Sequence, residues 1–312
     1  MKIVFLDKST VGNVSNLELL EEFGTVSYYD ETSPDQTKDR SSGADIIITN
    51  KVIIDHKVMD ANPDIKLICI AATGMNNVDL EYAAEKGIAV KNVSGYSTHS
   101  VTQSTFAMLF TLLNSVPYYD HFVKSGAYSK SKIFTHHGRE FTEIKGKTFG
   151  IIGLGVIGQS IANIADAFGC KVVYFSTSGK NTNQAYPCLE LNELLSTSDI
   201  VTIHAPLNEK TNNLIDLNKL KTMKPTALLI NAGRGNIVNE QDLAFAIDHK
   251  IIAGAALDVY GKEPVQADNP LLNVKNKDSI ILVPHIAWAS KESREMLIKG
   301  IYQNIAEFVE GI

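Results

Sequence analysis

Short apolar runs alternate with amphipathic segments along most of the chain. Between the first runs, segments such as 17–23 and 78–86 place apolar residues at helical intervals. The runs have the length of buried strands and lie at 2–6, 25–29, 45–50, 66–72 and 89–93. Repeated strand–helix units of this kind predict a doubly wound parallel sheet with helices on both of its faces.

The same alternation resumes near residue 148 and continues almost to the end of the chain. Helical patterns at 156–168, 189–196 and 240–249 connect the strands of this second half. The strands are expected at 149–152, 171–175, 200–204, 227–231, 255–259 and 280–283. About six parallel strands are what a complete dinucleotide-binding sheet requires.

Two further segments complete the predicted organisation. A helix at 100–115 is expected to end before Pro117, and the stretch 118–143 is interpreted as a surface excursion that contacts another subunit or covers the active site. The amphipathic segment 292–310 is expected to pack back on the first sheet. The sequence therefore predicts two domains, one formed by 1–98 plus 287–312 and the other by 99–286.

A glycine-rich turn joins the first strand of the second half to its first helix. Gly153, Gly155 and Gly158 have the spacing G-x-G-x-x-G, between the strand at 149–152 and the helix that follows. The three glycines permit a tight turn, close approach of a pyrophosphate and close helix–strand packing. The helix N-terminus then offers amide groups to the phosphates. A structural turn alone is the simpler alternative, but this context favours dinucleotide binding by residues 99–286.

The position expected to bind the cofactor ribose departs from the common pattern. An acid should end the second strand, about 20 residues after the glycines. Ser176 occupies that position and Thr177 and Lys180 follow it. Hydroxyls and a lysine would tolerate a 2′-phosphate, so NADP as well as NAD is predicted as cofactor, and a polar loop that binds NADH less selectively is the alternative.

Composition narrows the class of protein. The 312 residues carry a formal charge of −6 and are 44% hydrophobic, which gives no basic surface for nucleic acid. The apolar stretch at 106–113 is too short to span a bilayer, and the N-terminus lacks the organisation of a signal peptide. The cysteines, three in number, are widely spaced, which favours packed thiols over a disulfide framework or a metal site. A cytoplasmic protein without membrane or nucleic-acid partners is expected.

Polar residues follow the strands of the second half, where open parallel sheets bind ligands. Arg234, Glu263 and His285 come after successive strands, and each alone could belong to an ordinary turn or cap. Together they suit hydride transfer at C2 of a 2-oxo or 2-hydroxy acid. Histidine can exchange the proton near neutral pH, a carboxylate can orient the imidazolium, and a guanidinium can bind the substrate carboxylate.

These residues belong to longer motifs distributed along the chain. The motifs are GLGVIG at 153–158, HAPL at 204–207, INAGRGNIV at 230–238, GAALDVYGKEP at 254–264 and PHIAWAS at 284–290. On the basis of these motifs, the sequence resembles the D-isomer-specific 2-hydroxyacid dehydrogenase family over essentially its whole length. Within that family it is most similar to the glycerate dehydrogenase/hydroxypyruvate reductase branch. The resemblance implies a flavodoxin-like substrate domain, a Rossmann domain for NAD or NADP, and a homodimer joined through the cofactor domains.

The resemblance also implies individual roles. Arg234, Glu263 and His285 would be the catalytic residues, with His285 as acid/base. Substrate contacts would come from AATGMNNVDL at 71–80 and from neighbouring positions, namely Asn50, Lys51, Thr73, Gly74, Met75, Arg234, His285 and Trp288. Trp288 is either a lid over the substrate or a core residue. Cofactor contacts would come from Thr102, Gly153, Gly155, Val156, Ile157, Gly158, Ser176, Thr177, Lys180, His204, Ala205, Pro206, Thr211, Ala232, Gly233, Arg234, Asp258 and His285.

Several activities are compatible with this resemblance. Reduction of hydroxypyruvate or glyoxylate to D-glycerate or glycolate is favoured. D-lactate and D-3-phosphoglycerate dehydrogenases are alternatives, although the latter should carry more cationic groups for its phosphate. A different class is a co-repressor-like protein that senses NAD(H), but the extra tails of such proteins are not evident in this chain.

Overall fold

The computed structural model describes residues 1–311, which form two compact units. Unit 1 consists of Met1–Ser97 together with the segment that starts at Ala289, and unit 2 consists of Thr98–Trp288. Each unit is built on one open sheet whose strand pairs are all parallel. The predicted fold class, two parallel-sheet α/β domains, is therefore confirmed.

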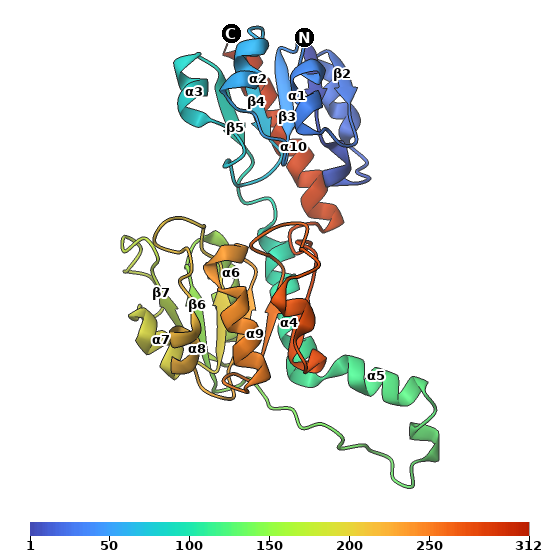
Figure 1. Ribbon diagram of the computed structural model, residues 1–312, viewed down its shortest axis with the longest axis vertical. Helices are drawn as coiled ribbons and strands as arrows, with labels where there is room; N and C mark the ends of the chain where they lie inside the picture. Colours follow the sequence, from blue (N-terminus) through green and yellow to red (C-terminus); the bar gives the residue numbers. More distant parts are fainter. Residues whose placement is uncertain (312) are drawn as a thin grey trace. The chain divides into compact units, whose positions relative to one another are not determined.

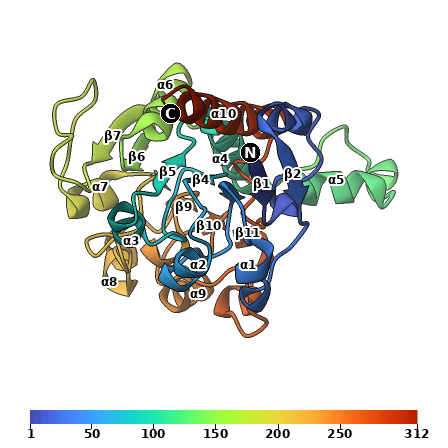
Figure 2. The ribbon, with the colours of Figure 1, turned by 90° about the horizontal axis from the view of Figure 1, so that it is seen from above.

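Unit 1 contains a sheet of five strands. Their spatial order is β2 (Thr25–Tyr28), β1 (Lys2–Phe5), β3 (Ile46–Thr49), β4 (Leu67–Ile70) and β5 (Ala89–Asn92). The helices are α1 (Pro34–Arg40), α2 (His56–Ala61), α3 (Leu80–Glu85) and α10 (Lys291–Glu310), with 3-10 turns η1 (Lys8–Val11) and η2 (Leu17–Phe23). Figure 2 shows α10 on one side of these strands and α1 and α2 on the other.

One difference from the expected helices has a local reason. The segment 17–23 is a 3-10 helix rather than an α-helix. Asn16 before it donates its side-chain amide to the carbonyl of Glu295, and Gly24 after it lies so close to Met1 that a Cβ would be 2.0 Å from the Met1 oxygen. Because both ends are fixed, the tighter and longer 3-10 geometry spans the segment.

Unit 2 contains a sheet of six strands. Their spatial order is β11 (Ile280–Leu282), β10 (Gly254–Leu257), β9 (Leu228–Asn231), β8 (Ile200–Ile203), β6 (Thr148–Ile152) and β7 (Lys171–Phe175). The helices are α4 (Thr98–Asn114), α5 (Val116–Lys124), α6 (Val156–Ala167), α7 (Leu191–Thr197), α8 (Leu217–Thr222) and α9 (Glu240–Asp248). The short 3-10 turns are η3 (Tyr128–Lys130), η4 (Gly235–Ile237), η5 (Pro270–Asn273) and η6 (Lys277–Ser279).

The strands of unit 2 are buried on both faces, as their continuous apolar runs predict. Leu229 packs in the core that contains helices α7, α8 and α9, whereas its neighbours Leu228 and Ile230 pack in the core that contains α4 and α6. This alternation follows from the two-residue period of a strand. The sheet is thus covered on both sides, and its loops are what remain accessible at the strand ends.

The helix predicted at 100–115 is confirmed as α4, but the segment after it contains a helix that was not predicted. α4 ends at Asn114, and Ser115 adopts a left-handed conformation with φ of 48°. A new helix, α5, then starts at Val116 and has Pro117 in its first turn. Proline lacks only an N–H that has no helical acceptor at this position, so it starts α5 instead of merely ending α4. Figure 1 shows α5 and the segment after it extending away from the sheet of unit 2.

The cysteines agree with the packed-thiol interpretation, since Cys69 and Cys170 are buried and all three are free. No helix within residues 1–311 is both long and apolar enough to cross a membrane.

Candidate active site

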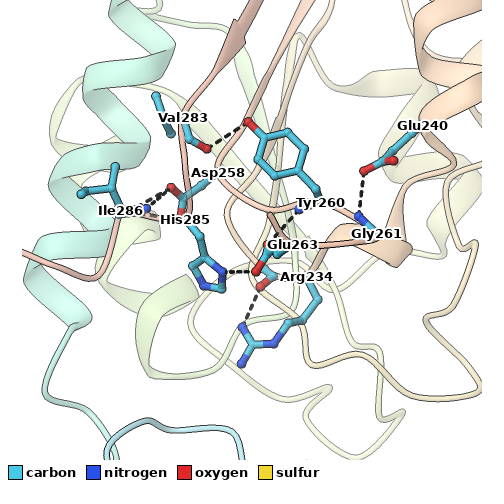
Figure 3. Close-up of polar contacts among 11 residues, drawn as sticks. Arg234, Glu240, Asp258, Tyr260, Gly261, Glu263, Val283, His285 and Ile286 are labelled. Atoms are coloured by element: carbon cyan, nitrogen blue, oxygen red, sulfur yellow. Dashed lines mark hydrogen bonds and ion pairs between the residues drawn. The ribbon is translucent and has the colours of Figure 1, made fainter. Parts of the chain in front are cut away.

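The carboxyl ends of β9, β10 and β11 bring the three predicted catalytic residues into one region of unit 2. Because these strands are neighbours in the parallel sheet, the loops that follow them meet at a single edge. Figure 3 shows the imidazole of His285 pointing to Glu263, with the guanidinium of Arg234 on the same side. Residues that are up to 51 positions apart, from 234 to 285, thus share one site.

His285 and Glu263 form a direct pair. Nδ1 of His285 lies 2.7 Å from Oε2 of Glu263, and the other carboxylate oxygen accepts a hydrogen bond from the Tyr260 N–H at 3.0 Å. The His285 side chain is 25% exposed to solvent and the Glu263 side chain 30%. Because Nδ1 faces a carboxylate it carries a proton, which leaves Nε2 as the nitrogen that can exchange a proton with a ligand.

The backbone around His285 is held from two sides. His285 has a φ of 50°, a left-handed conformation that is uncommon for residues other than glycine. Buried Asp258 accepts hydrogen bonds from the N–H groups of Ile286 at 2.7 Å and Ala287 at 3.1 Å. From α4, the Ser100 hydroxyl donates to the Ala287 carbonyl at 2.6 Å. These contacts fix the direction in which the imidazole leaves the chain.

Asp258 therefore has a structural task that the sequence did not reveal. Its carboxylate is 2% exposed and oriented toward the backbone after His285. Burial raises the pKa of this carboxyl, and the positive charge that His285 can carry lowers it in part. The predicted contact between Asp258 and the cofactor stays a prediction.

Arg234 is placed by a tight turn after β9. The side-chain amide of Asn231 donates to the Arg234 carbonyl at 2.9 Å, and its oxygen accepts from the Gly233 N–H at 3.1 Å. A Cβ at Gly235 would lie 1.9 Å from the Tyr260 carbonyl carbon. Only glycine permits this approach of two loops, and it brings the Arg234 turn beside the loop that carries Glu263.

The glycine turn has the local structure that a dinucleotide requires. Gly153 has a φ of 93° and packs against the His204 backbone, while a Cβ at Gly158 would lie 2.3 Å from the Gly153 oxygen. At Gly155, in contrast, an added Cβ would meet nothing within 4 Å. Open space beside Gly155 at the N-terminus of α6, where Val156 is 70% exposed, fits a pyrophosphate held by backbone amides.

The loop after β7 folds back on the glycine turn. Ser176 is buried, and its hydroxyl has no hydrogen-bond partner among the described residues. Lys180 is exposed, with its N–H donating to the Ser178 hydroxyl at 3.2 Å. The side-chain amide of Asn181 donates to the Leu154 carbonyl at 2.7 Å, which ties this loop to the glycine turn. An unpartnered hydroxyl at this place is suited to a ribose hydroxyl or phosphate, and the role of Asn181 was missed from the sequence.

His204 lies at the end of β8 beside the glycine turn. Neither ring nitrogen has a hydrogen-bond partner among residues 1–311. Burial lowers the pKa of His204 to about 3, so the ring is neutral at physiological pH. The next residues, Ala205 and Pro206, border the turn that contains Gly233, since a Cβ there would lie 3.1 Å from the Ala205 oxygen. The expected cofactor positions 204–206 and 232–234 thus adjoin each other.

Two residues expected to contact the cofactor have partners within the protein. Thr102 is 2% exposed, and its hydroxyl contacts the Thr98 carbonyl at 2.8 Å and Ser160 at 3.1 Å, which joins α4 to α6. Thr211 is fully buried and donates to the Pro206 carbonyl at 2.7 Å, which closes the loop after β8. These hydrogen bonds hold the two segments in place, and contact of Thr102 and Thr211 with the cofactor stays a prediction.

The predicted substrate residues of unit 1 lie at the carboxyl edge of its sheet. Asn50 and Lys51 follow β3, and Thr73, Gly74 and Met75 follow β4. The N–H groups of residues 73–75 donate to no other described residue, as expected for amides that receive a ligand carboxylate. Trp288 is the last residue of unit 2 and is half-buried, which leaves both the lid and the core interpretation open.

The fold and the site define a class of protein: a nicotinamide-dependent oxidoreductase with a histidine–carboxylate pair. Comparisons with known proteins give the family. Residues 106–287 match the family described as "D-isomer specific 2-hydroxyacid dehydrogenase, NAD binding domain".

Individual relatives agree with this match along the whole chain. A hydroxypyruvate reductase of Blautia hydrogenotrophica is 38% identical over 100% of this chain and 98% of its own length. A glycerate dehydrogenase of Methylorubrum extorquens is 35% identical over 99% of this chain and 96% of its own. Among solved structures, an acyclic imino acid reductase in complex with NADPH and D-Arg superimposes with a TM-score of 0.89 at 29% identity, covering 100% of this chain and 98% of that one. The chain belongs to the D-isomer specific 2-hydroxyacid dehydrogenase family.

Proposed function

We propose that the protein catalyses the reversible NAD(P)-dependent reduction of a small 2-oxo acid, hydroxypyruvate or glyoxylate, to D-glycerate or glycolate. The 2.7 Å pair of His285 with Glu263, on the same sheet edge as Arg234, is the observation that carries the proposal. The names of the two sequence relatives support the choice of substrate.

Proton transfer is the step that the His285–Glu263 pair performs. In the direction of reduction, the Nε2–H of protonated His285 donates its proton to the C2 carbonyl oxygen, and the ring becomes neutral. The nicotinamide, when bound, supplies the hydride that reaches C2. Glu263 stabilises the imidazolium before transfer and keeps Nδ1 protonated after it, so the ring keeps one orientation.

Substrate orientation is assigned to the guanidinium and to unit 1. Arg234 binds the substrate through planar N–H donors, which polarise the carbonyl and neutralise the carboxylate. The unengaged N–H groups of Thr73, Gly74 and Met75 in unit 1 are proposed to donate hydrogen bonds to a substrate carboxylate. Asn50, Lys51 and Trp288 remain proposed contacts to the remainder of the substrate.

The cofactor is assigned to the glycine turn and to the loop after β7. Gly153, Gly155 and Gly158 with the N-terminus of α6 would hold the pyrophosphate. Ser176, Thr177 and Lys180 would face the adenosine ribose, where no carboxylate excludes a 2′-phosphate. NADPH is therefore expected to serve as well as NADH, or better.

A homodimer through unit 2 is part of this proposal. Residues 115–143, called the arm below, extend from unit 2 (Figure 1). They carry exposed apolar side chains. Val123 is 55%, Ile133 61%, Phe134 90% and Phe141 59% exposed. A second copy that covers these side chains would remove apolar surface from water.

Location of the protein in the cytoplasm stays a prediction.

Initial rates on hydroxypyruvate, glyoxylate, pyruvate and phosphohydroxypyruvate, each with NADH and NADPH, test the proposed activity. The His285→Ala variant should lose about 100- to 10,000-fold in kcat, because it lacks the acid/base, while it still binds cofactor. The matched control is His56→Ala, a surface histidine of unit 1, which should keep wild-type rates. Cofactor binding by the wild type without turnover of any 2-oxo acid would instead favour a sensing protein.

A further inference from the structure

A buried carboxylate occupies the backbone amides of a proposed substrate loop in unit 1. Asp7 lies just after β1 and is 4% exposed. Its Oδ1 accepts a hydrogen bond from the Asn50 N–H at 2.9 Å, and its Oδ2 accepts from Lys51 at 2.6 Å and Val52 at 3.3 Å. Successive N–H groups that converge on one point form an anion-binding nest. In this loop the bound anion is a side chain of the protein itself.

In the adjacent loop, after β4, the backbone amides are open rather than filled. The N–H groups of Thr73, Gly74 and Met75 donate to no other residue within 1–311. The loop is nevertheless held, since the Thr73 hydroxyl donates to the Val93 carbonyl at 3.2 Å and the Asn92 amide donates to the Thr73 carbonyl at 2.6 Å. Two sets of amides therefore lie at one sheet edge, one filled and the other open.

Asn77 connects the two loops. Its side-chain amide donates to the Val52 carbonyl at 3.0 Å, and its own carbonyl accepts from the Ile54 N–H at 2.9 Å. Ile54 also forms a β-bridge with Val78. A displacement of the 50–52 loop would therefore be transmitted to the loop that carries the open amides.

We propose that Asp7 is a positioning residue for substrate recognition, which fixes the 50–52 loop and fills its nest so that the substrate carboxylate binds the amides of residues 73–75. This inference rests on the proposed function, because it assigns the carboxylate of a 2-oxo acid to unit 1. With its N–H bound, Lys51 keeps an exposed side chain, whereas Asn50 is 6% exposed. Asp7 thus also determines which of the two side chains the loop presents.

The chemistry of the nest requires a carboxylate. Asparagine would offer one acceptor oxygen and an NH2 group, and the NH2 would face N–H donors of the same polarity. Burial raises the pKa of the Asp7 carboxyl, and the N–H donors of Lys51, Asn50 and Val52 offset part of that rise. Asp7→Asn is therefore the smallest change that weakens the hydrogen bonds between residue 7 and the 50–52 amides, called the clamp below, without opening a cavity.

Hydrogen exchange tests the clamp without any need for activity. In Asp7→Asn, amides in the 50–54 segment should exchange at least about tenfold faster, because a hydrogen bond to a charged group is lost. Amides of β4 should keep wild-type protection. Asp45→Asn is the matched control, since Asp45 accepts the Lys2 N–H at 2.9 Å but precedes β3 at the opposite edge of the sheet. Unchanged exchange at 50–54 in Asp7→Asn would overturn the inference.

Kinetics test the consequence for recognition. For Asp7→Asn, the KM for the 2-oxo acid should rise about tenfold, with kcat and the KM for NADPH within about twofold of wild type, because the lost interaction binds the substrate equally in the ground state and the transition state. Asn77→Ala, which removes the side-chain part of the link between the loops and leaves its backbone part, should show the same separation to a smaller degree. Equal changes in both KM values, or none, would contradict a positioning role.

Chemical rescue separates positioning from general destabilisation. In Asp7→Gly the nest is empty, and added formate should lower the KM for the 2-oxo acid toward the wild-type value by binding the three amides. Formate should only inhibit the wild type and Asn77→Ala, in which Asp7 fills the nest. Failure of rescue in a folded Asp7→Gly protein would refute the nest. An inactive wild type would overturn the proposed function and the recognition half of the inference, whereas unchanged KM values in active Asp7→Asn overturn this inference alone.

Discussion

At the scale of residues, the side chains proposed to be catalytic depend on neighbours that have no proposed part in the chemistry. Glu263 is oriented by the Tyr260 N–H, and the backbone after His285 is held by Asp258 and Ser100. The positions of Arg234, Glu263 and His285 could be predicted because each residue follows a predicted strand and belongs to a motif. Ser100 could not, because a serine in a helix is compatible with many environments and its partner is 187 residues away.

The most direct prediction at this scale concerns Ser176. Ser176→Asp should lower kcat/KM with NADPH about tenfold or more relative to NADH. The new carboxylate would lie beside the 2′-phosphate of NADPH, and two like charges brought together cost several kcal/mol. Rates with both cofactors at several concentrations measure the ratio. The control is Ser178→Asp, two positions away in an exposed part of the same loop. An equal effect of Ser176→Asp on both cofactors would remove Ser176 from the choice of cofactor.

The buried histidine at the end of β8 gives a pH dependence of stability. Burial lowers the pKa of His204 from 6.5 to about 3, so below pH 6.5 the unfolded chain binds a proton that the native state does not. The free energy of unfolding should therefore fall as the pH is lowered, by about 2 kcal/mol from this group between pH 6.5 and 4.5. Urea unfolding at both pH values should show a smaller fall in His204→Gln.

A matched substitution distinguishes this effect from acid destabilisation in general. His56→Gln removes a histidine on the surface of α2 and should leave the pH dependence as in the wild type. If His204→Gln and wild type lose the same free energy of unfolding between the two pH values, the native ring of His204 is not held neutral.

At the scale of elements, glycines and strand ends determine which loops meet. Gly235 allows the turn after β9 to touch the Tyr260 backbone, and Gly153 allows the turn after β6 to touch His204. The sequence predicted the three-glycine turn because its spacing is local. It gave no sign of the Gly235 contact, because the partner loop follows a different strand. The start of α5 at Val116 was likewise missed, since Pro117 was interpreted only as the end of a helix.

The arm is the element with the clearest consequence for assembly. Replacing both Ile133 and Phe134 by Asp should convert a dimer to a monomer, because charged groups would then be buried in the contact between copies. Sedimentation equilibrium or light scattering gives the mass. Phe245→Asp on α9, also an exposed aromatic at 42%, is the control that should remain dimeric. A monomeric wild type, or a doubly substituted protein of unchanged mass, would refute the arm contact.

At the scale of the whole molecule, the chain is divided between two units with one sheet each. Unit 1 is completed by α10, whose contacts with β4, β5 and η2 join the last residues to the first. The Arg294 guanidinium donates to the carbonyls of Val11 and Asn13, and the Asn304 amide donates to the carbonyl of Asn92. The assignment of unit 1 to the substrate and of unit 2 to the cofactor follows the proposed function.

The strands, most of the helices, the glycine turn and the residues proposed to transfer a proton could be predicted from the sequence alone. These features depend on spacings of two to four residues, which local geometry converts directly into structure. Three findings required the three-dimensional structure: Asp7 accepts hydrogen bonds from the amides of residues 50–52, Asn181 ties the loop after β7 to Leu154, and Thr102 and Thr211 are buried. Those contacts join residues that are distant in the chain and that parallel sheets bring together at one edge. A local sequence pattern contains no information about such contacts.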